Sequence, residues 1–136
     1  MMNPALKRAQ LNREAILSAS PARLLTMLYD RLLVDLNRAE SAQLTGDFAV
    51  ASENLVHAQA IIAELASSLN TDVWSGAKEL QGIYTFVTQL LIDANIKRNP
   101  DLTRQAIVLM APLRQTWHDA AAAPTTASTT GGEFLA

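Results

Sequence analysis

A chain of 136 residues is long enough to bury one compact core but not two. Apolar residues make up 49% of the chain and aromatic residues only 5%, so Leu, Ile, Val and Ala must fill that core, as they do in packed helices. A formal net charge of −2 leaves no clustered basic face for nucleic acid, and the absence of Cys excludes disulfides, thiolate metal sites and Cys nucleophiles.

Residues 1–19 precede the first strong helix signal, and we expect them to form a separate N-terminal segment that is flexible or carries a short helix around residues 6–17. Residues 1–7 lack the apolar stretch of a secretion signal. Charged or polar residues interrupt every apolar run, so no window reaches the ~20 apolar residues of a membrane span. We therefore expect no direct membrane insertion, and the absence of Cys favours the reducing cytosol.

The first helix is predicted from residue 21 to about residue 44. Ser20 is a favourable N-cap and Pro21 suits the first helical position, while Thr45 and Gly46 mark the end. Asp47 can cap a second helix that runs to Asn70. Its apolar residues recur at alternating spacings of three and four: Phe48, Ala51, Leu55, Ala58, Ile62, Leu65 and Leu69.

The third helix has two candidate starts, at Thr71/Asp72 or at Ser75, and is expected to end at Lys97–Arg98. The same apolar spacing continues through Ala77, Leu80, Tyr84, Val87, Leu91 and Ala94. Asn99 and Pro100 then repeat the cap chemistry and predict a fourth helix, with a core face of Leu102, Ala106, Leu109 and Leu113. Pro112 should bend this helix, because an interior Pro removes one backbone hydrogen bond.

Connections this short require neighbouring helices to run antiparallel. The sequence therefore predicts an all-α protein, an antiparallel up-down four-helix bundle over residues 20–123. Residues 124–136 are rich in Thr, Ser and Gly, and we expect a disordered tail there.

Residues with catalytic or metal-binding chemistry are few. His57 and His118 have no companions in the sequence that would complete a hydrolytic or acid–base site. Glu53 lies four residues before His57, and a solvated ion pair between them is favoured over a metal site. The five glycines are scattered and form no phosphate-binding loop. We expect no enzyme activity, no metal and no cofactor.

The chain carries more apolar helix positions than the predicted seams require. The additional residues are Leu24, Met27, Val34, Val50, Val56, Ile61, Ile83, Phe86 and Leu90. Two interpretations are open: a wide core, since each helix of a bundle touches two neighbours, or an exposed groove that accepts an amphipathic or unfolded partner. Trp74 and Trp117 suit either interpretation.

Three blocks of sequence resemble a known family in order and spacing. The first is residues 18–21 followed by Leu-Thr-Met-Leu-Tyr-Asp at 25–30, and the second is Ala-Gln-Ala-Ile-Ile-Ala-Glu-Leu at 58–65 with Ser-Leu-Asn at 68–70. The third runs from Tyr84 through Ala-Asn-Ile-Lys-Arg-Asn at 94–99 and closes with Leu-Arg-Gln-Thr-Trp at 113–117. Over residues 16–120 the chain resembles the flagellin-specific export chaperones of the FliS family.

The resemblance implies a cytosolic helical bundle that binds the disordered C-terminal segment of flagellin. Such a chaperone blocks premature polymerisation and hands its client to a component of the flagellar export gate, without ATP, metal or catalysis. The partner-binding residues that we predict are Ile83, Phe86, Leu90, Asn95, Ile96, Lys97, Ile61 and Tyr29. Asn95 and Lys97 are equally compatible with capping and interhelix packing at a chain reversal.

A second hypothesis of a different class is a self-associating structural bundle without a flagellin client. In that case the additional apolar stripe would form a homodimer interface, and a homodimer of the client-free protein is also left open under the first hypothesis.

Overall fold

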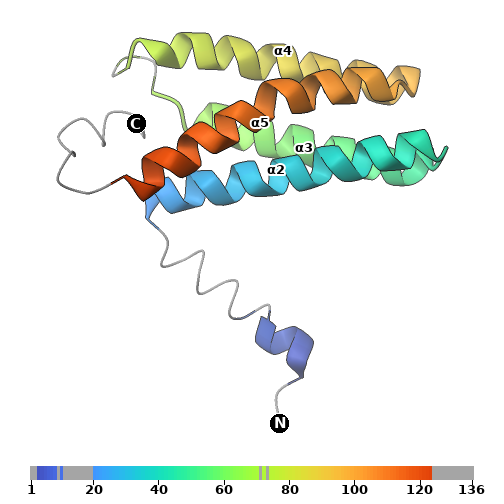
Figure 1. Cartoon of the computed structure of the whole chain (residues 1–136), viewed down its shortest axis with the longest axis horizontal. Coiled ribbons are helices and arrows are strands. Elements are labelled where there is room, and N and C mark those ends of the chain that lie inside the picture. The colour runs from blue at the N-terminus through green and yellow to red at the C-terminus, as the bar shows by residue number, and fades with distance from the viewer. Residues whose placement is uncertain (1–2, 9, 11–19, 71, 73, 124–136) are drawn as a thin grey trace.

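The computed structural model describes residues 3–8, 10, 20–70, 72 and 74–123. Within them, the long helices are α2 (Pro21–Leu44), α3 (Phe48–Ser67), α4 (Gly76–Lys97) and α5 (Pro100–Ala122). Figure 1 shows these helices side by side in an up-down arrangement, and α2 and α4 each pack against both α3 and α5. The prediction of an all-α four-helix bundle is confirmed. Within the described residues, no helix is long and apolar enough to cross a membrane.

Polar caps start three of the helices at the predicted residues. The Ser20 hydroxyl accepts from the Arg23 amide at 3.2 Å, and the Asp47 carboxylate accepts from the Val50 amide at 3.3 Å. The Asn99 side chain accepts from the backbone amide two residues later at 2.9 Å. Each bond satisfies an amide that the helix itself leaves without a partner.

The sequence did not fix the start of α4 or the end of α3. Of the two candidate starts for α4, the later is correct, since the helix begins at Gly76; the Ser75 side chain makes no capping bond. Helix α3 ends at Ser67 rather than at the predicted Asn70. Ser68 lies beyond the last helical residue, and its hydroxyl donates to the Leu65 carbonyl at 2.7 Å, which ties the final turn together.

The core follows the predicted spacing closely on α3 and α4. Its buried side chains on these helices are Ala51, Leu55, Ala58, Ile61, Ile62, Leu65, Ala77, Leu80, Tyr84, Val87, Leu90, Leu91 and Ala94. Phe48 and Leu69, at the two ends of the predicted α3 seam, are only half-buried. The three-four spacing therefore identifies the buried face of each helix but not where burial stops.

The predicted core face of α5 is partly wrong. Leu109 is 38% exposed, whereas Thr103, Ile107 and Met110 are buried. Thr103 can lie inside because its hydroxyl donates to the Gln43 Oε1 atom at 2.7 Å. The apolar pattern therefore missed Thr103, a polar residue that can be buried because it has a buried hydrogen-bond partner.

Helix α5 continues through Pro112 but does not run straight. In Figure 1 its first part lies beside α4 and its last part lies beside the start of α2. The predicted bend in the fourth helix agrees with this path.

The N-terminal segment is described only in part, and residues 4–8 and 10 are helical. Residues 11–19 and the predicted tail at 124–136 lie outside the described residues, so the proposed division of the chain at 19/20 and 123/124 stays a prediction.

Candidate functional site

The predicted apolar stripe of α4 extends from the core to the surface. Ile83, Phe86 and Leu90 are spaced by three and four residues and so share one side of the helix. Leu90 is 8% exposed and Ile83 is half-buried against the core, while Phe86 is 55% exposed. Phe86 is therefore the member of this stripe that a partner can reach most easily.

The C-terminal end of α4 combines packing with exposure. Asn95 donates to the Ser52 hydroxyl of α3 at 3.1 Å, which supports the interhelix role considered for it. The next residue, Ile96, is 74% exposed, and Lys97 is also exposed. The end of α4 thus offers one apolar and one cationic side chain to solvent.

Tyr29 and Ile61, the two predicted contacts outside α4, are buried in the core. The Tyr29 and Tyr84 hydroxyls lie 2.5 Å apart and join α2 to α4. Burial raises the pKa of both phenols, so both are protonated at neutral pH. Tyr29 and Ile61 are therefore packing residues of the bundle core. Direct contact with a partner stays a prediction for all eight residues of the predicted set.

A cavity that sequence reasoning did not identify opens at the end of the bundle where α4 begins and α5 ends. We call it the tryptophan cavity; its lining is Trp74, Leu80, Leu113, Thr116, Trp117 and Ala120. The rings of Trp74 and Trp117 meet edge to face, with centroids 6.4 Å apart. A Cβ atom at Gly76 would lie 2.6 Å from the Trp74 ring, so glycine is what admits the indole there.

The positions of the two tryptophans in the sequence could have predicted this cavity. Trp74 precedes the third helix and Trp117 lies near the end of the fourth, and antiparallel helices bring such positions together.

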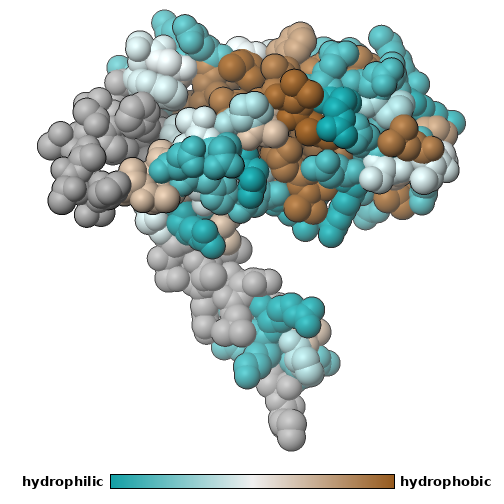
Figure 2. Space-filling view, viewed as in Figure 1, coloured by the Kyte–Doolittle hydropathy of each residue, from teal (hydrophilic) through white to brown (hydrophobic). Residues whose placement is uncertain are grey.

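Exposed apolar side chains are not confined to the cavity. Figure 2 shows apolar residues gathered over the middle of one face, where α5 passes between α4 and α2. The exposed large apolar residues of α2, α4 and α5 are Leu24, Val34, Leu44, Phe86, Ile96, Val108 and Leu109. The additional apolar positions divide into two groups: Ile61 and Leu90 widen the core, whereas Val34 and Phe86 lie at the surface. A groove that accepts a partner stays a prediction.

Each of the two histidines contacts an aspartate of α2. His57 Nδ1 contacts the buried Asp35, whose other oxygen lies 3.1 Å from Arg31 Nε. The predicted pair with Glu53 is wrong, since His57 reaches across to α2 instead of along its own helix. On the other side of α2, His118 Nε2 lies 2.6 Å from an Asp30 oxygen.

These pairs do not assemble a metal site. Among the described residues, no three His, Cys, Asp or Glu side chains gather closely enough to hold a metal ion. Each aspartate instead lies beside one arginine and one histidine, which fits a role in fastening α2 to α3 and α5.

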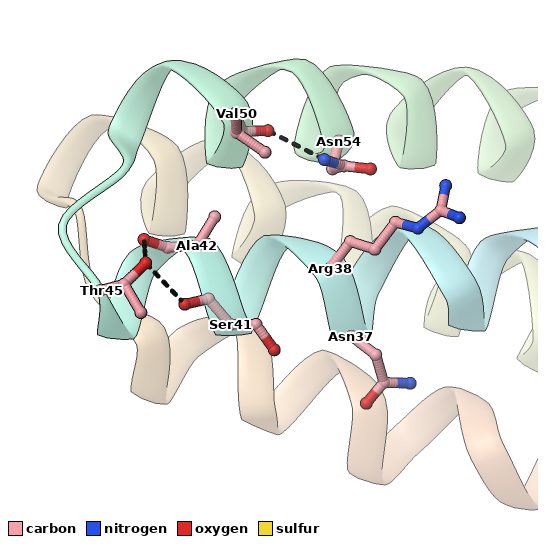
Figure 3. Close-up of a pocket in the computed structure, with 7 residues that line it drawn as sticks. All are labelled: Asn37, Arg38, Ser41, Ala42, Thr45, Val50 and Asn54. Carbon is pink, nitrogen blue, oxygen red and sulfur yellow. Dashed lines mark hydrogen bonds between the residues drawn. The ribbon is translucent and has the colours of Figure 1, made fainter.

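A hollow between α2 and α3 is shown in Figure 3, lined by Asn37, Arg38, Ser41, Ala42, Thr45, Val50 and Asn54. The Thr45 hydroxyl bonds the carbonyls of Ser41 and Ala42, and Asn54 donates to the Val50 carbonyl at 2.9 Å. Asn37 likewise donates to a carbonyl of its own helix, so three of the polar side chains of this hollow bond the backbone beneath them.

The fold and surface together define a small helical-bundle protein that keeps apolar side chains accessible on α4 and α5. Residues 2–124 match the family described as "Flagellar protein FliS", and the chain belongs to this FliS family. It is 29% identical over 108 residues to the flagellar secretion chaperone FliS of Bacillus subtilis (strain 168), covering 79% of this chain and 80% of that protein. It is also 29% identical over 101 residues to the flagellar secretion chaperone FliS of Vibrio cholerae, covering 74% of each.

Proposed function

We propose that this protein is a cytosolic flagellar secretion chaperone that binds the disordered C-terminal segment of flagellin. By covering that segment it prevents premature polymerisation, and it delivers the client to a component of the flagellar export gate. The observation that carries the proposal is the accessible apolar surface of α4 and α5, centred on Phe86 and continued at the tryptophan cavity.

A segment that packs inside a filament must expose apolar residues when it is free, and an apolar helix surface can cover them. Contiguous exposed apolar patches often mark surfaces that bind another protein. If ordering the client buries on the order of 2000 Å² in total, the ordering cost offsets much of the gain, which leaves an affinity that permits later release.

Calorimetry with a synthetic flagellin C-terminal peptide tests the proposal. We expect saturable binding with a dissociation constant on the order of tens of micromolar or tighter. Absence of binding in that range contradicts the flagellin assignment.

Phe86→Ala tests where the peptide binds. Removing an aromatic side chain that binding buries should cost at least ~1.4 kcal/mol. That cost raises the dissociation constant about tenfold. Val56→Ala on α3 is the matched control, since Val56 is 56% exposed and Phe86 is 55% exposed. Equal affinities for the two variants would place the client elsewhere on the bundle.

The self-associating bundle is the alternative, and the same exposed apolar residues favour it. Sedimentation velocity at several protein concentrations separates the two functions. A stable dimer whose sedimentation is unaffected by the flagellin peptide supports self-association and contradicts the chaperone assignment.

A further inference from the structure

The tryptophan cavity is large enough to hold side chains from another segment. Its volume is about 290 Å³, and its walls are almost entirely apolar. An apolar cavity of about 150 Å³ is already enough to hold a benzene ring. The tryptophan cavity can therefore accept an aromatic side chain together with an aliphatic one.

The cavity lies beside the point where the described chain leaves the bundle. Ala120 forms part of its wall, α5 ends at Ala122, and the last described residue is Ala123. Figure 1 shows the end of α5 and the start of α4 at the same end of the molecule. Any segment that follows α5 starts within a few residues of the opening.

The sequence after α5 has a spacer followed by two large apolar residues. Residues 124–132 are Pro, Thr, Ala, Ser and Gly only, and Phe134 and Leu135 are the large apolar residues of the stretch 124–136. The eleven residues from Pro124 to Phe134 span roughly 18 Å as a random coil and at most about 36 Å when extended. Phe134 can therefore return to a cavity that begins at Ala120.

We propose that Phe134 and Leu135 fold back and occupy the tryptophan cavity, so that the chain covers its own apolar opening. A short tether presents the pair at an effective concentration of roughly millimolar. A second copy of the protein would have to reach a comparable concentration to compete, which favours the chain's own tail. The inference can be tested without flagellin, because it concerns only the cavity and the residues that follow it. A tail bound there would compete with a client for the cavity, but not for the surface around Phe86.

The chain contains its own probes for this contact, since both of its tryptophans line the cavity. Tryptophan emission and acrylamide quenching are compared between the full chain and the variant Phe134→Ala/Leu135→Ala. We expect the variant's emission to move to longer wavelength and its quenching to increase, because water replaces the two side chains. The control Thr129→Ala/Thr130→Ala changes the spacer alone and should leave both signals unchanged.

A peptide of residues 124–136, titrated into the full-length double variant, completes the test. We expect saturable reversal of the emission shift with a dissociation constant of about 1 mM or tighter, the range in which a tethered copy stays bound. Ala120→Leu, added to the double variant, narrows the cavity and should abolish the response.

Three results would overturn the proposal. Identical emission and quenching for the full chain and the double variant would show that the pair does not reach the cavity. A peptide without effect up to millimolar concentration has the same meaning. An emission maximum that follows protein concentration, with a dimer in sedimentation, would assign the cavity to a second copy.

Discussion

At the scale of single residues, Asp30 is the clearest case in which charge decides a local property. The same Asp30 oxygen receives Arg114 Nε and His118 Nε2 of α5, each at 2.6 Å. Burial alone raises the pKa of this carboxyl, but the hydrogen bonds from His118 and Arg114 and their positive charges outweigh it. The pKa of Asp30 is therefore held below its ordinary value of 3.8.

This shift predicts a pH dependence with a definite sign. A carboxyl whose pKa is lowered by folding stabilises the protein above the unfolded pKa, and this contribution disappears as the pH falls through the folded pKa. We expect Asp30→Asn to lower the free energy of unfolding at pH 7 by no more than ~1 kcal/mol, because the carboxylate is partly exposed. Urea unfolding between pH 7 and pH 3 should show the difference shrinking as the pH falls below 3.8. A difference that is constant with pH would contradict this account.

At the scale of helices, one polar chain ties together three elements of the core. Gln43 of α2 donates to the Ala94 carbonyl of α4 at 3.1 Å and accepts from the Thr103 hydroxyl of α5 at 2.7 Å. Gln43 and Thr103 are buried, so a lost partner leaves a polar atom without water.

Thr103→Val should therefore lower the free energy of unfolding by about 1–3 kcal/mol, since Gln43 Oε1 loses its donor. Thr85→Val is the control, because the Thr85 hydroxyl is exposed and bonds only the preceding turn of its own helix. Urea denaturation measures both variants. Equal effects would show that the buried bond adds nothing beyond the change of side chain.

The helices also show what a sequence can and cannot predict. Ser20, Asp47 and Asn99 marked three starts correctly because an N-cap is a local event. The burial of Thr103 could not be foreseen in the same way, since its partner Gln43 lies sixty residues earlier. Similarly, Phe86 was identifiable as a surplus apolar residue, but only the packing of the bundle shows that Leu90, on the same stripe, is buried.

At the scale of the whole molecule, the helices differ in how extensively they pack against their neighbours. Helix α2 packs extensively against both α3 and α5, whereas α4 contacts its two neighbours more sparsely. The most exposed residues of the predicted site, Phe86, Ile96 and Lys97, all lie on α4. Elements that bind partners are often those with the lowest local stability, because binding then supplies the contacts that the free protein lacks.

Hydrogen exchange followed by mass spectrometry tests this difference directly. We expect the amides of α4 to exchange faster than those of α2, through an opening that leaves α2, α3 and α5 together. Phe86 and Ile96 lie on α4, so saturating flagellin peptide should slow exchange in α4 far more than in α2. Uniform exchange across the four helices would mean that the bundle opens only as a whole. Protection gained in α2 and α3 alone would place the client on the opposite side of the molecule, because α4 then gains no contacts from it.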